Sequence, residues 1–380
     1  MTDCTWGDIC TLDYGKALRG CAEEPSDENR FRVFGTNGPI GWSSQSLSDG
    51  PGVIVGRKGA YRGIHFSPEP FFVIDTAYYV RPKSDKLDLR WAYYKLLTFD
   101  MDRIDVGAAI PTTSRSAFYA VPVSIPSRKA QVAVAATLSA YDEMMENNRR
   151  RMGLLEESAR LLYREWFVRL HFPGHEHVRI TNRIPDGWER KPLAALCESI
   201  DYGYTASAEQ EEVGPKFLRI TDIVPDFIDW PAVPHCPIED DRLEKFRLRE
   251  GDIVIARTGA TVGYAKRMHK RHPDAVFASY LVRLRLKPEA DNLMVGVFVE
   301  SEDFKSYVQS RVGGAAQPNA NARVLAGAEI LVPPPRIQRD FREFVEPLID
   351  QREVLQWQNQ KLRAARDLLL PRLMSGEITV

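Results

Sequence analysis

The chain has 380 residues, of which 44% are hydrophobic and 27% charged, and its formal net charge is −1. This length predicts two or three soluble globular domains, and the near-zero charge excludes a protein that coats nucleic acid through bulk charge alone. Its sequence has neither an apolar run of about 18 residues nor an N-terminal signal-peptide pattern, so we expect a cytoplasmic protein without a membrane segment.

The first globular segment is predicted over residues 1–126. A turn at Pro51 leads into a β-branched strand that ends at Gly56, and Phe71 to Ile74 predicts another strand. A helix is expected from Leu89 to Thr98. Short strands followed by a helix indicate an α+β domain.

A long helix is predicted over residues 127–170, because the apolar period changes abruptly after Pro126 and proline marks a helix start. The spacing of its apolar positions alternates between four and three residues, which is typical of a coiled-coil seam. The seam consists of Val134, Leu138, Tyr141, Met145, Asn148, Met152, Leu155, Ala159, Leu162 and Trp166.

Residues 171–183 are predicted to be a linker. They carry three close histidines, His171, His175 and His177, without a fourth ligand nearby. Three histidines alone are weak evidence for a metal, and the five cysteines are scattered without CxxC spacing. We therefore expect free thiols and no metal site.

The second globular segment is predicted over residues 184–333. Strands are expected at Gly251 to Ala256 and Tyr280 to Arg285, followed by one helix from Leu293 to Ser310. A second long helix is predicted over residues 334–380, with a kink at Pro347. Its seam repeats the first at Phe341, Val345, Leu348, Arg352, Leu355, Asn359, Leu362, Arg366, Leu369 and Leu373.

The second half of the chain repeats the first. Residues 54–63 return as 254–263, with Arg57 and Arg257 separated by 200 positions. Further correspondences in the same order pair Asp13-Tyr14-Gly15 with Asp201-Tyr202-Gly203, residues 78–81 with 280–283, and residues 107–111 with 314–318. The predicted fold is therefore two tandem α+β domains, each followed by a long helix, with the two helices forming an antiparallel coiled coil.

If the helices pack with the two-fold symmetry of the duplication, Asn148 lies opposite Asn359. A buried asparagine pair in a seam costs stability but fixes register and partner choice. The alternative, in which both side chains are solvated, stays open.

These features resemble the specificity (S) subunits of type I restriction-modification systems, and the resemblance covers essentially the whole chain. The residues that carry it are 34–41, the Arg-containing turns at Arg57 and Arg257, residues 75–79, 162–167 and 369–378. The resemblance implies two target-recognition domains that each read half of a split DNA site, and a coiled coil that fixes the gap. It also implies two methyltransferase subunits as partners and a motor-nuclease subunit that can join.

Candidate DNA contacts follow from chemistry, since arginine and amide side chains read base edges while cations and hydroxyls bind phosphates. In the first repeat they are Asn37, Arg57, Lys58, Tyr61, Arg62 and Thr112, with Thr113 and Ser114 beside Thr112. In the second they are Tyr204, Thr205, Arg257, Thr258, Thr261, Gln317 and Asn319. For each one, an ordinary surface or turn residue is the competing interpretation.

No catalytic role is predicted. The sequence lacks the Gly-rich cofactor loop and the Asn-Pro-Pro-aromatic motif of a methyltransferase. We expect no cofactor in this chain, with S-adenosylmethionine, Mg²⁺ and ATP on the partner subunits that the resemblance implies. The competing hypothesis is a protein-interaction scaffold that does not bind DNA sequence-specifically.

Overall fold

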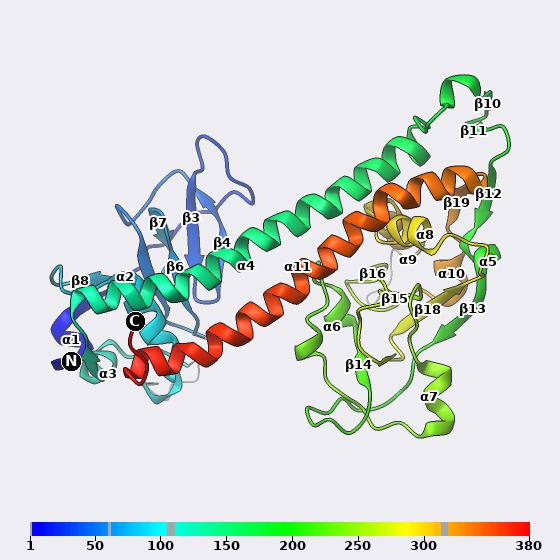
Figure 1. The fold of residues 1–380 in the computed structure, drawn as a ribbon. Helices are drawn as coiled ribbons and strands as arrows, with labels where there is room; N and C mark the ends of the chain where they lie inside the picture. Colours follow the sequence, from blue (N-terminus) through cyan, green and yellow to red (C-terminus); the bar gives the residue numbers. More distant parts are fainter. Residues whose placement is uncertain (1, 60–61, 105–110, 313–317) are drawn as a thin grey trace. The chain divides into compact units, whose positions relative to one another are not determined.

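The structure is a computed structural model that describes residues 2–59, 62–104, 111–312 and 318–380 (Figure 1). It divides into two compact units: unit 1 comprises Met1–Met145 and Lys361–Val380, and unit 2 comprises Glu146–Gln360. The two long helices are α4 (Arg128–Tyr163) and α11 (Pro335–Ser375). Each long helix therefore contributes one part to each unit. The boundaries predicted from the sequence instead treat the two helices as segments separate from the globular domains.

Unit 1 is an α+β unit built on short strands. Its strands are β1 (Thr2–Thr5), β2 (Cys10–Tyr14), β3 (Phe31–Gly35), β4 (Gly38–Ser43), β5 (Gly52–Gly56), β6 (Ile64–Ser67), β7 (Phe71–Val73), β8 (Ala77–Pro82) and β9 (Pro122–Ile125). Its short helices are α1 (Trp6–Ile9), α2 (Leu89–Leu97), the 3-10 turn η1 (Met101–Ile104) and α3 (Arg115–Ala120). One antiparallel sheet has the order β2-β8-β5-β6, a second has the order β4-β3-β7 with β3 and β7 parallel, and β1 pairs with β9.

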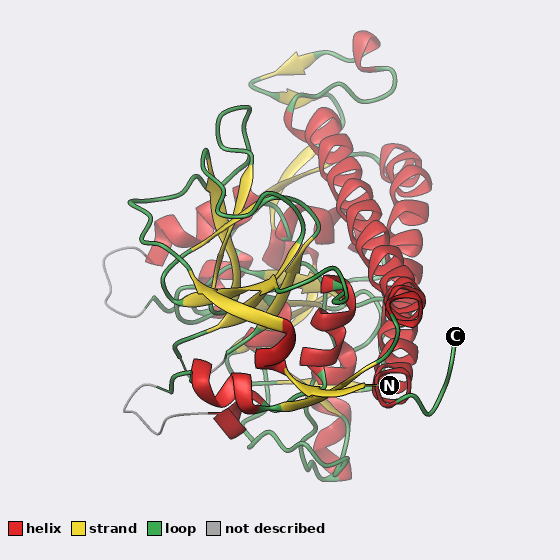
Figure 2. Cartoon of the chain, turned by 90° about the vertical axis from the view of Figure 1, so that its left-hand side faces the viewer, coloured by secondary structure: helices red, strands yellow, loops and turns green. Residues whose placement is uncertain are grey.

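The core of unit 1 forms where α2 and the ends of both long helices meet the first sheet. Val53 and Val55 of β5 are fully buried, as suits β-branched residues in a central strand. Trp91 of α2, Leu138 of α4 and Leu373 of α11 belong to the same hydrophobic cluster. In Figure 2, where unit 1 faces the viewer, the parts of the long helices that belong to unit 1 lie along one side of its strands.

Unit 2 is also an α+β unit of short strands and short helices. Its strands are β10 (Ile180–Thr181), β11 (Ile184–Pro185), β12 (Glu189–Pro192), β13 (Cys197–Tyr202), β14 (Lys216–Leu218), β15 (Ile253–Ala256), β16 (Ala265–Arg267), β17 (Ala275–Phe277), β18 (Leu281–Leu286) and β19 (Glu329–Val332). Its short helices are the π-helical turn η2 (Arg164–Val168), η3 (His175–His177), α5 (Leu193–Leu196), α6 (Ile220–Ile223), η4 (Trp230–Ala232), α7 (Asp240–Phe246), α8 (Asn292–Val299), α9 (Glu302–Val312) and α10 (Ala322–Ala326).

The strand order of unit 2 repeats that of unit 1. Its main sheet runs β13-β18-β15-β16, β14 and β17 are parallel like β3 and β7, and β12 pairs with β19 as β1 does with β9. The duplicated α+β architecture predicted from the sequence is therefore confirmed.

Strand register corrects one part of the predicted alignment. Tyr14 pairs with Tyr78 in unit 1, and its equivalent Tyr202 pairs with Val282 in unit 2. Tyr78 thus corresponds to Val282, two residues beyond the Tyr280 that sequence similarity favoured. A shift of two residues keeps each side chain on the same face of the strand, so the apolar pattern of the sequence does not reveal it.

The predicted helix from Leu293 to Ser310 is two helices. α8 ends at Val299 and α9 starts at Glu302. The Ser301 hydroxyl accepts a hydrogen bond from the backbone N–H of Phe304, which is the action of an N-cap and starts a new helix. α11, in contrast, continues as helix through Pro347.

Within each unit the segments of α4 and α11 pair along the predicted seam. In unit 2, Asn148 Nδ2 donates to Asn359 Oδ1 at 2.9 Å, and Arg352 lies 3.9 Å from the carboxylate of Glu156. The partner number falls as the residue number rises, which defines an antiparallel pair. In unit 1, Arg366 donates to Asp142 at 2.6 Å.

None of the helices in the described parts of the chain combines the length and the apolarity that crossing a membrane requires.

Candidate nucleic-acid interface

In unit 1, three connections meet beside the end of β5. The backbone N–H of Arg57 donates to Thr76 O at 2.9 Å in the turn between β7 and β8, and Arg57 O accepts from the N–H of Thr113 at 2.9 Å. Gly59 N donates to Pro111 O at 3.0 Å. These bonds fix the backbone on both sides of Arg57, so its side chain projects from a rigid base.

The Thr36-Asn37 turn between β3 and β4 joins this cluster. Thr36 O accepts from the N–H of Gly63 at 3.2 Å and lies 3.3 Å from the His65 ring nitrogen. A Cβ at Gly56 would lie 2.7 Å from the Thr36 hydroxyl, so only glycine allows this approach. The turn therefore places exposed Asn37 in the same group of loops as Arg57.

The Arg57 guanidinium stacks on an aromatic ring. Its central carbon lies 4.9 Å from the centre of the Tyr14 ring, and its Nη1 donates to Asp75 O at 2.9 Å. Tyr14, at the end of β2, is 45% exposed. Stacking holds a guanidinium in one orientation while leaving it accessible to an anion.

Unit 2 repeats this arrangement. Arg257 N donates to Tyr280 O at 3.1 Å, and Arg257 O accepts from Ala320 N at 2.8 Å. The Arg257 guanidinium lies 4.8 Å from the centre of the Tyr202 ring, and its Nη2 donates to Asn319 Oδ1 at 3.2 Å. Tyr202 is the equivalent of Tyr14, so an arginine–tyrosine stack occupies the same place in both units.

Unit 2 has two surface hollows of note, with volumes of about 380 and 510 Å³. The larger one lies beside Arg257. It is lined by Thr205, Arg257, Thr258, Ser279, Tyr280, Pro318 and Asn319. Hydroxyls, an amide, a guanidinium and a Tyr280 ring that is 62% exposed offer donors, acceptors and an aromatic face. Such a surface suits phosphates and base edges.

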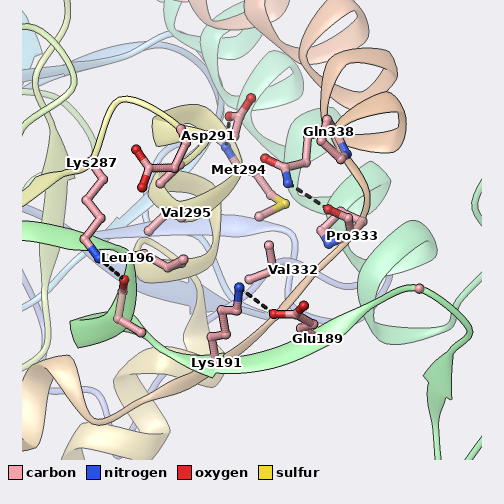
Figure 3. A pocket seen from close by; sticks show the side chains of 15 residues that line it. Glu189, Lys191, Leu196, Lys287, Asp291, Met294, Val295, Val332, Pro333 and Gln338 are labelled. Atoms are coloured by element: carbon pink, nitrogen blue, oxygen red, sulfur yellow. Dashed lines mark hydrogen bonds and ion pairs between the residues drawn. The ribbon is translucent and has the colours of Figure 1, made fainter.

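The smaller of the two hollows lies at the other end of β18 (Figure 3). There Lys287 Nζ donates to Ala195 O at 2.9 Å, and Gln338 Nε2 donates to Pro333 O at 2.7 Å. Lys191 pairs with Glu189 at 2.5 Å. Both lysines of this hollow are thus bound to groups of the protein. The hollow lies at the Leu286 end of β18, whereas Tyr280 and the Arg257 cluster lie at the opposite end, so the two hollows are separate.

Several of the predicted contact residues lie at or near the surface of these loops. Asn37, Lys58 and Thr205 are exposed, and the half-buried Thr112 and Thr258 form backbone bridges beside the arginines, to Lys58 and Asn319 respectively. The bridges make Thr112 and Asn319 equivalent, so the two repeats present different side chains at one position.

Other predicted contacts support the loops from within. Arg62 is 6% exposed and pairs with Asp102, so the prediction that it faces DNA is corrected. Thr113 is buried and donates to Gly56 O, and Ser114 caps α3. Their hydroxyls satisfy backbone groups, a role that sequence chemistry does not separate from phosphate binding.

Two predicted contact residues of unit 2, Tyr204 and Thr261, make contacts within the protein. The Tyr204 ring packs 5.1 Å from that of Phe246, and the carbonyl of Thr261 accepts from Tyr264 N. Tyr61 and Gln317, both predicted contacts, lie outside the described residues.

Both tyrosines of the stacks and Arg115 lie outside the contact residues predicted from the sequence. Tyr14 and Tyr202 stood in the Asp-Tyr-Gly correspondence, which marked the duplication but was not interpreted as a site. Arg115 lies 4.3 Å from the Tyr14 ring centre. Nothing in the sequence joins it to Tyr14, because the two are 101 positions apart.

Burial shapes the protonation of groups behind the unit 1 loops. It raises the pKa of Tyr78, a shift that the neighbouring Tyr14 reinforces and Arg57 opposes. Burial lowers the pKa of His65, although its bond to Thr36 acts in the opposite direction. The neutral forms of both side chains are therefore favoured beneath the loops.

A buried ionic network joins the unit 2 domain to the helix pair. Arg352 donates to Glu353 at 3.0 Å, and His272 Nε2 lies 3.3 Å from the other Glu353 oxygen. Burial alone raises the pKa of Glu353, but the bond from His272 and the charge of Arg352 lower it to about 2. Among the described residues, no group of three or more His, Cys, Asp or Glu is arranged to hold a metal ion.

Comparison with known proteins matches the first part of the chain to a family and finds similar proteins over most of its length. The family described as the type I restriction modification DNA specificity domain matches residues 3–157. The MjaIX specificity subunit of a type I restriction enzyme from Methanocaldococcus jannaschii is 24% identical over 76% of this chain and 69% of its own length. The MjaVIII specificity subunit from the same organism is 23% identical over 72% of this chain and 66% of its own length.

A solved structure shares the fold. The crystal structure of a type I restriction-modification S subunit from M. genitalium has a TM-score of 0.61 and 16% identity, covering 98% of this chain and 95% of that one. Residues 3–157 thus match the type I restriction modification DNA specificity domain, and over most of its length the chain is similar to specificity subunits of type I restriction enzymes.

Proposed function

We propose that this chain recognises a bipartite DNA sequence, with the Arg57 loops of unit 1 reading one half and the Arg257 loops of unit 2 the other. The observation that carries the proposal is the recurrence of one loop cluster, with its arginine–tyrosine stack, at equivalent places in both units. Two equivalent binding surfaces in one chain suit a DNA target that has two parts.

The shared and the divergent residues of the cluster take different parts in binding. Arg57 and Arg257 are common to both units, which suits contact with the phosphate backbone that every sequence shares. Lys58 is replaced by Thr258, and Thr112 by Asn319. Divergent side chains beside a fixed phosphate contact suit base reading, for which an asparagine amide pairs with adenine.

The long helices supply the spacing and the assembly surface. The Asn148–Asn359 hydrogen bond lies within the seam and would fix one register of the pair. Exposed apolar side chains on the helices, such as Leu154 (69%) and Leu368 (73%), offer surface for other subunits. The partners are two methyltransferase subunits, which a motor-nuclease subunit can join.

The chemistry belongs to those partners. S-adenosylmethionine, Mg²⁺ and ATP would bind to the methyltransferase and motor-nuclease subunits, and this chain would hold none of them. The complex acts on double-stranded DNA in the cytoplasm.

Methylome sequencing tests the proposal. Cells expressing this chain with its methyltransferase partner should acquire a split methylated motif, and replacing residues 184–333 with those of a relative should change one half of it only. A swap that changes both halves would contradict the division into two readers. An assembled complex that adds no methylation would favour a protein-interaction scaffold instead.

A further inference from the structure

We infer that the two units hold the DNA backbone with unequal charge: unit 1 through two arginines stacked on Tyr14, and unit 2 through one arginine stacked on Tyr202. The inference rests on the proposed function and assigns a role to Arg115, which lies outside the turns that the duplication marks.

Tyr14 organises the two cations of unit 1. Arg115 lies 4.3 Å and Arg57 4.9 Å from the centre of its ring. Arg115 Nη1 also donates to Leu12 O at 3.4 Å, as Arg57 Nη1 does to Asp75 O at 2.9 Å. Each guanidinium is thus oriented by one ring and one backbone carbonyl.

These two cations lack the carboxylate partners that most arginines of the chain have. Within the described residues, neither Arg57 nor Arg115 forms an ion pair, and the carboxylate of Asp13, the residue before Tyr14, binds Arg81 at 2.7 Å. Two guanidinium groups on one exposed ring repel each other without an anion between them. Phosphate oxygens of the DNA backbone are anions that guanidinium groups bind strongly.

Unit 2 has the same framework, but among the described residues one arginine instead of two lies over its tyrosine ring. Ser114 caps α3 by accepting from Ala117 N, and Asn321 caps α10 by accepting from Val324 N. The residue after each cap is Arg115 in unit 1 and Ala322 in unit 2. The Tyr202 hydroxyl accepts from Ala322 N at 3.0 Å.

The remaining cation of unit 2 is directed differently. Arg257 donates to the Asn319 side chain at 3.2 Å, whereas Arg57 donates to a backbone carbonyl. The Arg257 guanidinium thus shares its donors with a side chain that faces the same hollow. Unit 1 would anchor the complex on the backbone, and unit 2 would hold the DNA less tightly and read it through Asn319.

Salt dependence measures the difference. Each phosphate neutralised adds about 0.9 to the slope of log affinity against log salt. Loss of one contact therefore makes the affinity loss between 50 and 200 mM salt about 3.5-fold smaller. A base contact changes sequence preference instead.

The experiment uses the assembled methyltransferase complex and fluorescent duplexes that carry the methylated motif or a scrambled one. Arg115→Ala should lower the slope by about 0.9 on both duplexes, Arg115→Lys should retain most of it, and Ala322→Arg should raise it by about 0.9. Arg30→Ala is the matched control. Arg30 is an exposed arginine that stacks on Phe31 at 5.0 Å, but it precedes the first residue of β3, whereas the Asn37 turn follows the last one.

The outcomes separate the two proposals. If the wild-type complex prefers its motif but neither Arg115→Ala nor Ala322→Arg changes the slope, the unequal grip is wrong and the proposed function stands. If the wild type does not distinguish the two duplexes, the proposed function fails and this inference with it. Gel filtration of each variant complex establishes that assembly is intact, and Ala322→Arg tests the idea without removing any native contact of Arg115.

Discussion

Replacing Asn148 and Asn359 with leucine tests whether the asparagine pair trades stability for register. Asn148 is 4% exposed and Asn359 is half-buried, and the two share a hydrogen bond of 2.9 Å. A fully buried leucine stabilises by about 1.5–3 kcal/mol, a half-buried one by about half as much, and the lost hydrogen bond costs about 1 kcal/mol. The double variant should therefore be more stable by about 1–3 kcal/mol.

The single variant should behave differently. In Asn148→Leu, the Asn359 amide loses its Asn148 partner inside the seam, which costs about 1–3 kcal/mol and offsets the gain from leucine. The stability of the single variant should therefore change little. The two substitutions should show a coupling free energy of about 1–2 kcal/mol in a double-mutant cycle.

Urea unfolding of the four proteins in that cycle gives the coupling directly. Asn147→Leu is the control, because Asn147 is adjacent but exposed and its replacement should change stability by less than about 0.5 kcal/mol. Strictly additive substitutions, or a single variant as stable as the double, would refute the reasoning. Where the complex methylates DNA, the double variant should also accept more than one gap length, since leucine tolerates neighbouring registers.

Four further predictions follow from the charged and titrating groups. Arg257→Ala should weaken binding to all duplexes alike and lower the salt slope by about 0.9; a changed motif in methylome sequencing would contradict a backbone role. Arg352→Met removes the buried cation that donates to Glu353 and should destabilise by about 3–5 kcal/mol in urea unfolding at pH 7, whereas a loss below about 1 kcal/mol would contradict a structural role for this buried pair. Because the pKa of Glu353 is lowered to about 2, its contribution is complete above the unfolded value near 4.5 and is lost as pH falls from there towards 2; Glu353→Gln should flatten the stability curve in that window. Burial lowers the pKa of His65, so its contribution is complete above the unfolded value near 6.5 and is lost as pH falls below it; melting curves of His65→Asn should show a weaker loss of stability in acid than the wild type, and an unchanged loss would exclude His65 as its source.

Periodicity was enough to predict the fold class. The seam residues, the strand at Val53 to Val55 and the duplication itself are visible because a buried surface imposes a repeat on the sequence. The helix break at Ser301 was hidden, because the apolar pattern continues on both sides of an ordinary serine cap.

Only part of the candidate site could be predicted from the sequence. Arg57 and Arg257 could be found because they recur in matched turns. The burial of Arg62 and the stacking of Arg115 on Tyr14 depend on how distant loops pack, and a charged residue looks the same in a sequence whether it faces solvent or a buried carboxylate. Long-range packing, and not residue chemistry, decides which cations remain available.

The division of each long helix between two units bears on how the chain folds during synthesis. Leu373 and Met374 belong to the hydrophobic core of unit 1, yet more than 200 residues of unit 2 are translated between them and the rest of that core. At about 5–20 residues per second, the ribosome takes roughly 10–40 s to cover that distance. Part of the apolar surface of unit 1 therefore stays exposed until the last turns of α11 leave the ribosome. A chaperone or an early-binding subunit that shields this surface would raise the yield of native protein, and a nascent chain stalled before residue 361 would be prone to aggregation.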